Sequence, residues 1–101
     1  AGFSTGAFLS YGLGCKMARS FAAVGANAGA IRPDQLVACA SGRPIAVQSF
    51  HSLADPTVPY NGTAAWGSQP EVDAMWRKRN GCTGGEPARV TFTSATSTCR
   101  R

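Results

Sequence analysis

Histidine and acidic residues, on which metal centres and acid–base sites depend, are scarce in this sequence. The chain has one histidine, His51, and five acidic residues among its 101 residues. Its four cysteines include no C-x-x-C pair, and a structural zinc site needs clustered cysteine or histidine ligands. We therefore expect neither a metal centre nor another cofactor.

Charged residues and long apolar runs are also few. Charged residues make up 15% of the chain, against about 25% in an average globular protein. No apolar run reaches the roughly 18 residues of a membrane span, and no charged segment followed by an apolar core marks a signal peptide. A sequence with so few charged residues is typical of a segment from the interior of a larger α/β domain. We expect residues 1–101 to form one partial domain with no membrane partner.

The chain is basic, with a net charge of +5. Its cations cluster at residues 77–79 and 100–101, without the interleaved aromatic residues that are typical of nucleic-acid-binding surfaces. These clusters indicate a solvated helix end and a charged terminus. Nucleic acid is therefore not an expected partner, and a small basic nucleic-acid binder is the least favoured interpretation.

Four widely spaced cysteines, Cys15, Cys39, Cys82 and Cys99, are present. Their even number, without histidine partners, predicts two disulfides and an oxidising compartment. Four cysteines allow three pairings, of which Cys15 with Cys39 and Cys82 with Cys99 is the simplest. Buried free thiols in a cytosolic protein are the alternative interpretation.

The triplet Asn61-Gly62-Thr63 has the form of an N-glycosylation acceptor and lies in a turn-rich stretch. Such a triplet also arises often by chance. Together with the cysteines it favours an extracellular protein, whose signal peptide is not within these residues.

Two helices are predicted from apolar spacing. Residues 5–19 read as a helix buried almost all round, with Leu9 and Met17 on a second apolar face. Residues 69–80 read as a helix with acidic residues at its start, basic residues at its end and Gly81 after it. Its expected buried face consists of Val72, Met75, Trp76 and Arg79.

Strand candidates alternate with these helices. They are the end of a strand at residues 1–3, a short buried strand and loop within 21–31, the clearest strand at 45–50, and a last one at 89–93. This order predicts an α/β fold with a mostly parallel sheet and flanking helices. Such sheets carry their chemistry on loops at the carboxyl ends of the strands.

The residues Gly2-Phe3-Ser4-Thr5-Gly6 have the form G-x-S-x-G. In that motif a sharp turn between a strand and a helix lifts a serine hydroxyl out of the backbone, and Ser4 stands in this context. Gly2 and Gly6 are expected to allow the close approach of strand and helix. The backbone N–H of Thr5 would help to bind an oxyanion. A serine that merely caps the helix is the alternative.

Asp55 lies a few residues past the clearest strand and follows Ser4 in the chain. That position is where a serine hydrolase of this strand order places its triad acid, although a turn aspartate is the alternative. His51 precedes Asp55, and we expect it to support the acid loop rather than act as the base. Without a histidine base, Ser4 is a weak nucleophile.

Three blocks of the sequence, "GFSTGAFLSYGLGCKMARSFAAVGANAGAI", "RPIAVQSFHSLADPTVPYNG" and "VDAMWRKRNGC", resemble the secreted esterases related to polyhydroxybutyrate depolymerase and to feruloyl and acetylxylan esterases. The resemblance implies a partial α/β-hydrolase fold, with Ser4 as nucleophile, Asp55 as acid and His51 as a structural histidine. It also implies a bridge between Cys82 and Cys99. Ser52 stands where that family usually has glycine.

By this resemblance the chain is a fragment of a secreted serine carboxylic-ester hydrolase that begins at the nucleophile turn and lacks the histidine segment. Its substrate would be an acyl or feruloyl ester on polysaccharide, or a hydroxyalkanoate polyester. The chain alone is expected to be inactive. The alternative is a degenerate, non-catalytic hydrolase module with a binding role or none.

Overall fold

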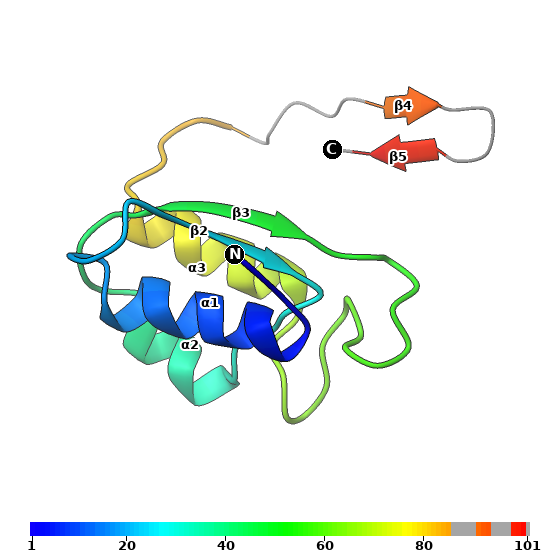
Figure 1. Ribbon diagram of the computed structural model, residues 1–101, viewed down its shortest axis with the longest axis horizontal. Helices are drawn as coiled ribbons and strands as arrows, with labels where there is room; N and C mark the ends of the chain where they lie inside the picture. Colours follow the sequence, from blue (N-terminus) through cyan, green and yellow to red (C-terminus); the bar gives the residue numbers. More distant parts are fainter. Residues whose placement is uncertain (86–90, 94–97, 101) are drawn as a thin grey trace.

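The computed structural model describes residues 1–85, 91–93 and 98–100. Strands and helices alternate along the first 80 residues, and a separate pair of short strands follows (Figure 1). In chain order the elements are β1 (Gly2–Phe3), α1 (Thr5–Lys16), β2 (Ala23–Asn27), α2 (Pro33–Cys39), β3 (Ala46–Phe50), α3 (Gln69–Arg79), β4 (Thr91–Thr93) and β5 (Thr98–Arg100).

The first three strands form a parallel sheet in the order β1-β2-β3. The register aligns Phe3 with Asn27 and Asn27 with Phe50, so the carboxyl ends of all three strands lie at one edge. The backbone continues this alignment past the strands, because the N–H of Ser4 donates to the carbonyl of Asn27 at 2.9 Å and that of Ala28 to Phe50 at 2.9 Å. This α/β arrangement is the one that the sequence predicted.

All three helices lie on the same face of the sheet (Figure 1). Successive strand residues point to opposite faces, and on β2 the buried pair Val24 and Ala26 faces the helices. The other face carries Phe3 and Phe50, which are 70% and 55% exposed. A parallel sheet is normally covered on both faces, whereas in the part of the chain that the structure describes no helix covers the face of Phe3 and Phe50.

The helix α1 buries one side only, through Ala7, Ser10, Tyr11 and Gly14. The prediction of burial all round is wrong, since Leu9 is 63% exposed and Met17 is 46% exposed. A helix that packs on a single sheet meets protein on one side.

The helix α3 buries the face predicted from its spacing, namely Val72, Met75, Trp76 and Arg79, together with Gln69. Its start is fixed by a capping box, in which Ser68 and Glu71 each accept the other's backbone N–H. The helix ends one residue earlier than expected, at Arg79, and Asn80 takes its C-cap position.

The helix α2 was not predicted. It has seven residues, too few for a clear apolar period, and begins with Pro33 and Asp34. Proline at the first helical position and an acidic residue in the first turn are typical of a helix start. That local signal was present in the sequence.

Cys15 and Cys39 form a disulfide that joins α1 to α2, as the simplest pairing predicted. The buried guanidinium of Arg79 lies beside it and donates to the backbone carbonyls of Cys15 at 3.0 Å, Cys39 at 3.1 Å and Arg43 at 3.0 Å. Arg79 is 7% exposed and sits over the ring of Trp76. The C-terminal ends of three helices therefore meet around one cation, whose charge their dipoles favour.

The second predicted bridge lies outside the described side chains. Cys82 is exposed and free among the described residues, and the side chain of Cys99 in β5 is not described. The strands β4 and β5 pair antiparallel. In the described part of the chain no helix is long and apolar enough to cross a membrane.

Candidate active site

Ser4 lies in the tight turn between β1 and α1 with φ 52° and ψ −116°. A non-glycine residue with positive φ is strained, and an N-cap residue normally has extended backbone angles and caps with its side chain. Ser4 does neither, since its hydroxyl makes no capping hydrogen bond. The Ser4 hydroxyl therefore does not serve as a helix cap in this turn.

Gly2 is required by the close approach of β1 to α1. A Cβ placed on Gly2 would lie 2.0 Å from the carbonyl oxygen of Gly6, which no side chain tolerates. A Cβ on Gly6 would meet nothing within 4 Å outside the helix's own backbone. The expectation of crowding thus holds at Gly2 and is wrong at Gly6.

Thr5 is the first residue of α1. A backbone N–H at this position has no intrahelical acceptor and lies at the positive end of the helix dipole. Because it directly follows Ser4, it can donate to a negative oxygen formed on an acyl group that Ser4 attacks.

Asp55 lies in the loop after β3, where its carboxylate is held by the backbone. Its Oδ1 accepts the N–H of Thr57 at 2.9 Å and that of Val58 at 2.9 Å. The two hydrogen bonds, with Val58 contributing most and a smaller effect of nearby His51, keep the pKa of Asp55 below its usual range. A carboxylate that remains ionised is what the acid of a catalytic triad requires.

His51 stands directly after β3 and supports this loop. Its Nε2 lies 2.7 Å from the carbonyl oxygen of Val58 and 3.7 Å from Oδ2 of Asp55, and its side chain is 4% exposed. A carbonyl only accepts, so Nε2 carries the proton and donates it. Nε2 is therefore engaged, which agrees with a supporting rather than a basic role.

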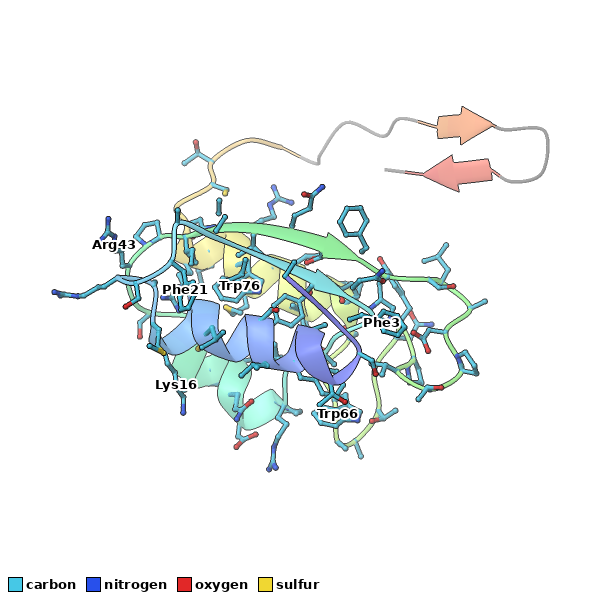
Figure 2. All side chains as sticks on the ribbon, viewed as in Figure 1. Phe3, Lys16, Phe21, Arg43, Trp66 and Trp76 are labelled. Carbon is cyan, nitrogen blue, oxygen red and sulfur yellow. A yellow bond between two sulfur atoms is a disulfide. The ribbon has the colours of Figure 1, made fainter. Side chains whose placement is uncertain are left out.

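The structure brings Ser4 and Asp55 to the same edge of the sheet. Ser4 follows β1 and the Asp55 loop follows β3, with β2 between them. Neighbouring strands lie about 4.8 Å apart, so the ends of β1 and β3 are separated by roughly 10 Å. Figure 2 shows Phe3 and Trp66 at this end of the molecule, while Lys16 and Arg43 lie at the other.

A polar network beneath this edge was not predicted from the sequence. The hydroxyl of Tyr11 on α1 shares a hydrogen bond of 2.8 Å with Ser49 on β3 and accepts one of 3.3 Å from Gln69 on α3. Gln69 also donates to Asp73 at 3.0 Å. Burial raises the pKa of the Tyr11 hydroxyl. The side chain of Tyr11 thereby links α1 to β3, a contact that joins residues 38 positions apart.

An open groove of about 990 Å³ runs along β3 and α3 from His51 to Cys82. Three of its lining side chains bury a polar atom that has no partner among the described residues: Nδ1 of His51, Oε1 of Gln69 and Nε1 of Trp76. Buried polar atoms are normally paired. These three atoms are therefore unpaired within the described residues.

Metal ligands do not gather in the described residues, where no group of three or more histidine, cysteine or acidic side chains lies close enough to hold an ion.

The chain is similar to part of a fungal esterase. Over 62 residues, 60% of its length, it is 37% identical to the protein named "Probable feruloyl esterase C" of Aspergillus flavus and covers 22% of that protein. Over 90 residues, 88% of its length, it is 32% identical to the Aspergillus niger protein of the same name and covers 28% of it. The protein of that name from Aspergillus oryzae matches as the A. flavus one does. No family model and no solved structure matches. The chain thus corresponds to an esterase-related region and spans about a quarter of the length of these curated relatives.

Proposed function

We propose that the chain carries the nucleophile and the acid of a serine carboxylic-ester hydrolase with an α/β-hydrolase fold. The observation that carries the proposal is the backbone of Ser4, whose φ of 52° and uncapped hydroxyl are the properties of a strained nucleophile turn. Asp55 at the same sheet edge and the similarity to feruloyl esterases support it.

In this mechanism the Oγ of Ser4 attacks the ester carbonyl, and the resulting oxyanion accepts the N–H of Thr5. An imidazole takes the proton of Oγ and passes it to the leaving alcohol, after which water repeats the sequence and releases the acid. Asp55 orients that imidazole. Its depressed pKa keeps it ionised through both steps.

The imidazole must come from outside residues 1–101, because the only histidine in them is His51 and its Nε2 is committed to Val58. We propose that a further segment of polypeptide supplies it.

The proposed substrate is a feruloyl or other acyl ester linked to polysaccharide, with a hydroxyalkanoate polyester as the alternative. The names of the relatives favour the first. The exposed ring of Phe3, next to Ser4 in the chain, suits an apolar acyl group. The proposed site of action is extracellular, which the Cys15–Cys39 disulfide supports.

The test replaces the matched segment of the A. niger feruloyl esterase C with this chain and measures hydrolysis of methyl ferulate and of p-nitrophenyl acetate. We expect turnover, and we expect Ser4→Ala and Asp55→Ala each to lower kcat by a factor of about 10³ or more. Ser20→Ala, which changes an exposed serine away from the sheet edge, should leave kcat unchanged.

A second measurement uses the 101-residue chain alone, which should show no Ser4-dependent burst with p-nitrophenyl acetate. A burst lost in Ser4→Ala would mean that His51 acts as the base and that a separate histidine is not needed. A folded hybrid that Ser4→Ala leaves fully active would overturn the proposed nucleophile.

A further inference from the structure

Two triplets in this chain begin with asparagine followed by glycine, but they lie in different structural surroundings. One is Asn61-Gly62-Thr63, and the other is Asn80-Gly81-Cys82. The first has the acceptor form N-x-S/T for an N-linked glycan. The second departs from it by cysteine in the third place, and the fold also treats the two asparagine amides differently.

Asn61 is held at the surface by a tight turn. The N–H of Gly62 donates to the carbonyl of Pro59 at 2.9 Å, and the side chain of Asn61 is exposed and makes no hydrogen bond within the described residues. Gly62 has φ +76°, and a Cβ there would lie 2.7 Å from Ser68 N and 2.7 Å from Trp66 O. The turn therefore requires glycine at this point and leaves the Asn61 amide open to an enzyme.

Thr63 completes the acceptor triplet at the same surface. It is exposed, and its Oγ1 accepts the N–H groups of Ala65 at 3.1 Å and Trp66 at 3.2 Å. A hydroxyl that accepts in this way keeps its own O–H as a donor. Both polar side chains that a glycosyltransferase reads thus remain accessible in the folded chain.

Asn80 has both ends of its amide engaged. Its Nδ2 donates to the carbonyl of Ile45 at 2.8 Å, and its Oδ1 accepts the N–H of Ile45 at 3.0 Å. This pairing anchors the C-cap of α3 to the residue before β3. A sugar on Nδ2 would crowd the paired segment and break at least one of the two bonds.

We propose that Asn61 is an acceptor of an N-linked glycan and that Asn80 is not. The donor is an oligosaccharide linked through pyrophosphate to a lipid. The Nδ2 of Asn61 attacks C1 of the first sugar, the bond from C1 to the pyrophosphate oxygen breaks, and the amide loses one proton as the lipid pyrophosphate leaves. This site is independent of the ester chemistry proposed above, since it uses neither Ser4 nor Asp55.

The first test secretes the chain from yeast behind a signal peptide and measures its intact mass before and after treatment with a peptide N-glycosidase, which converts the glycosylated asparagine to aspartate. We expect a glycosylated protein that collapses to one mass on treatment, and unglycosylated protein from Asn61→Gln and Thr63→Ala. Thr63→Ser should keep the glycan, and so should Asn80→Gln. Release in H₂¹⁸O separates glycan removal from spontaneous deamidation at Asn-Gly. A secreted wild-type chain with the unmodified mass would overturn the proposal, and so would a glycan retained in Asn61→Gln.

The second test isolates the effect of the fold. Cys82→Thr makes the two triplets identical in sequence, and the purified folded variant is treated with a soluble N-glucosyltransferase and UDP-glucose, then mapped by peptide mass. We expect one hexose on Asn61 under native conditions and modification of Asn80 only after unfolding in urea. If native Asn80 reacts as fast as Asn61 in a variant whose thermal melt matches wild type, the structural argument is wrong.

Discussion

The ring of His51 is tied to the carbonyl oxygen of Val58 by a hydrogen bond of 2.7 Å, and the N–H of the same Val58 is bound to Asp55. One residue of the loop thus connects the only histidine to the candidate acid. This relationship gives His51 a testable structural role.

Replacing His51 should loosen the acid loop. We expect His51→Ala to lower the free energy of unfolding by about 2 kcal/mol, because it removes a buried hydrogen bond and leaves the Val58 carbonyl unpaired. His51→Gln, whose amide N–H can reach the position of Nε2, should recover at least half of that loss in urea titrations. Equal losses in both variants would show that the hydrogen bond to Val58 does not matter.

Stability should depend on the ionisation of Asp55 at acid pH. The folded-state pKa lies below the ordinary value of 3.8, so this carboxylate stabilises the fold above the unfolded-state pKa, and the effect is lost as pH falls through the folded-state pKa. Asp55→Asn should therefore show a flatter loss of stability below about pH 4. Glu71→Gln is the comparison, since hydrogen bonds from Ser68 also depress the pKa of Glu71. If stability falls below about pH 4 as steeply in Asp55→Asn as in the wild type, this assignment is wrong.

The two glycines on either side of Ser4, Gly2 and Gly6, should respond in opposite ways to alanine. Gly2→Ala places a methyl group against the Gly6 carbonyl and should prevent the turn from forming, with a loss above about 3 kcal/mol. Gly6→Ala adds a methyl group that meets nothing and should raise stability by up to about 1 kcal/mol through helix propensity. Thermal melts of the two variants measure the difference, and a stable Gly2→Ala protein would contradict it.

Arg79 should be important for stability although no ion pair with a carboxylate is found for it within residues 1–85. Arg79→Met leaves three carbonyl groups without their donor, and we expect a loss of about 3 kcal/mol. Lys78→Met removes an exposed cation from the same helix and should change stability by less than about 0.5 kcal/mol. Similar urea midpoints for the two variants would mean that the carbonyl contacts of Arg79 contribute little.

The Cys15–Cys39 bridge closes a loop between residues 24 positions apart. The double change to alanine should lower the free energy of unfolding by about 3 kcal/mol, chiefly by freeing the unfolded chain.

Counting thiols in the oxidised, denatured protein tests the predicted second bridge. No free thiol is expected, whereas two would show that Cys82 and Cys99 remain unpaired.

Local patterns predicted much of this fold because they depend on neighbouring residues. The G-x-S-x-G turn, the strand at residues 45–50 and the buried face of α3 all follow from short-range spacing, and the structure has each of them. The short helix α2 was not predicted because its seven residues show no clear apolar period. The prediction that Leu9 is buried was wrong, because sequence spacing shows which positions are apolar and does not show whether another layer covers them.

Motif and chain order name Ser4 and Asp55 as candidate site residues, and these roles stay a prediction. The polar contacts around them were not predicted. Three sets of hydrogen bonds join residues 35 to 64 positions apart: Tyr11 with Ser49, Asn80 with Ile45, and Arg79 with backbone carbonyls. No periodicity encodes such long-range polar contacts, since each depends on how the helices settle on the sheet.

The unusual backbone at Ser4 also bears on how such a protein evolves. At a φ of 52° glycine is less strained than serine. The substitution Ser4→Gly therefore relieves local strain while it removes the hydroxyl. Random mutation selected only for folding would drift toward that substitution. A lineage that keeps serine at this bend is being selected for something other than stability.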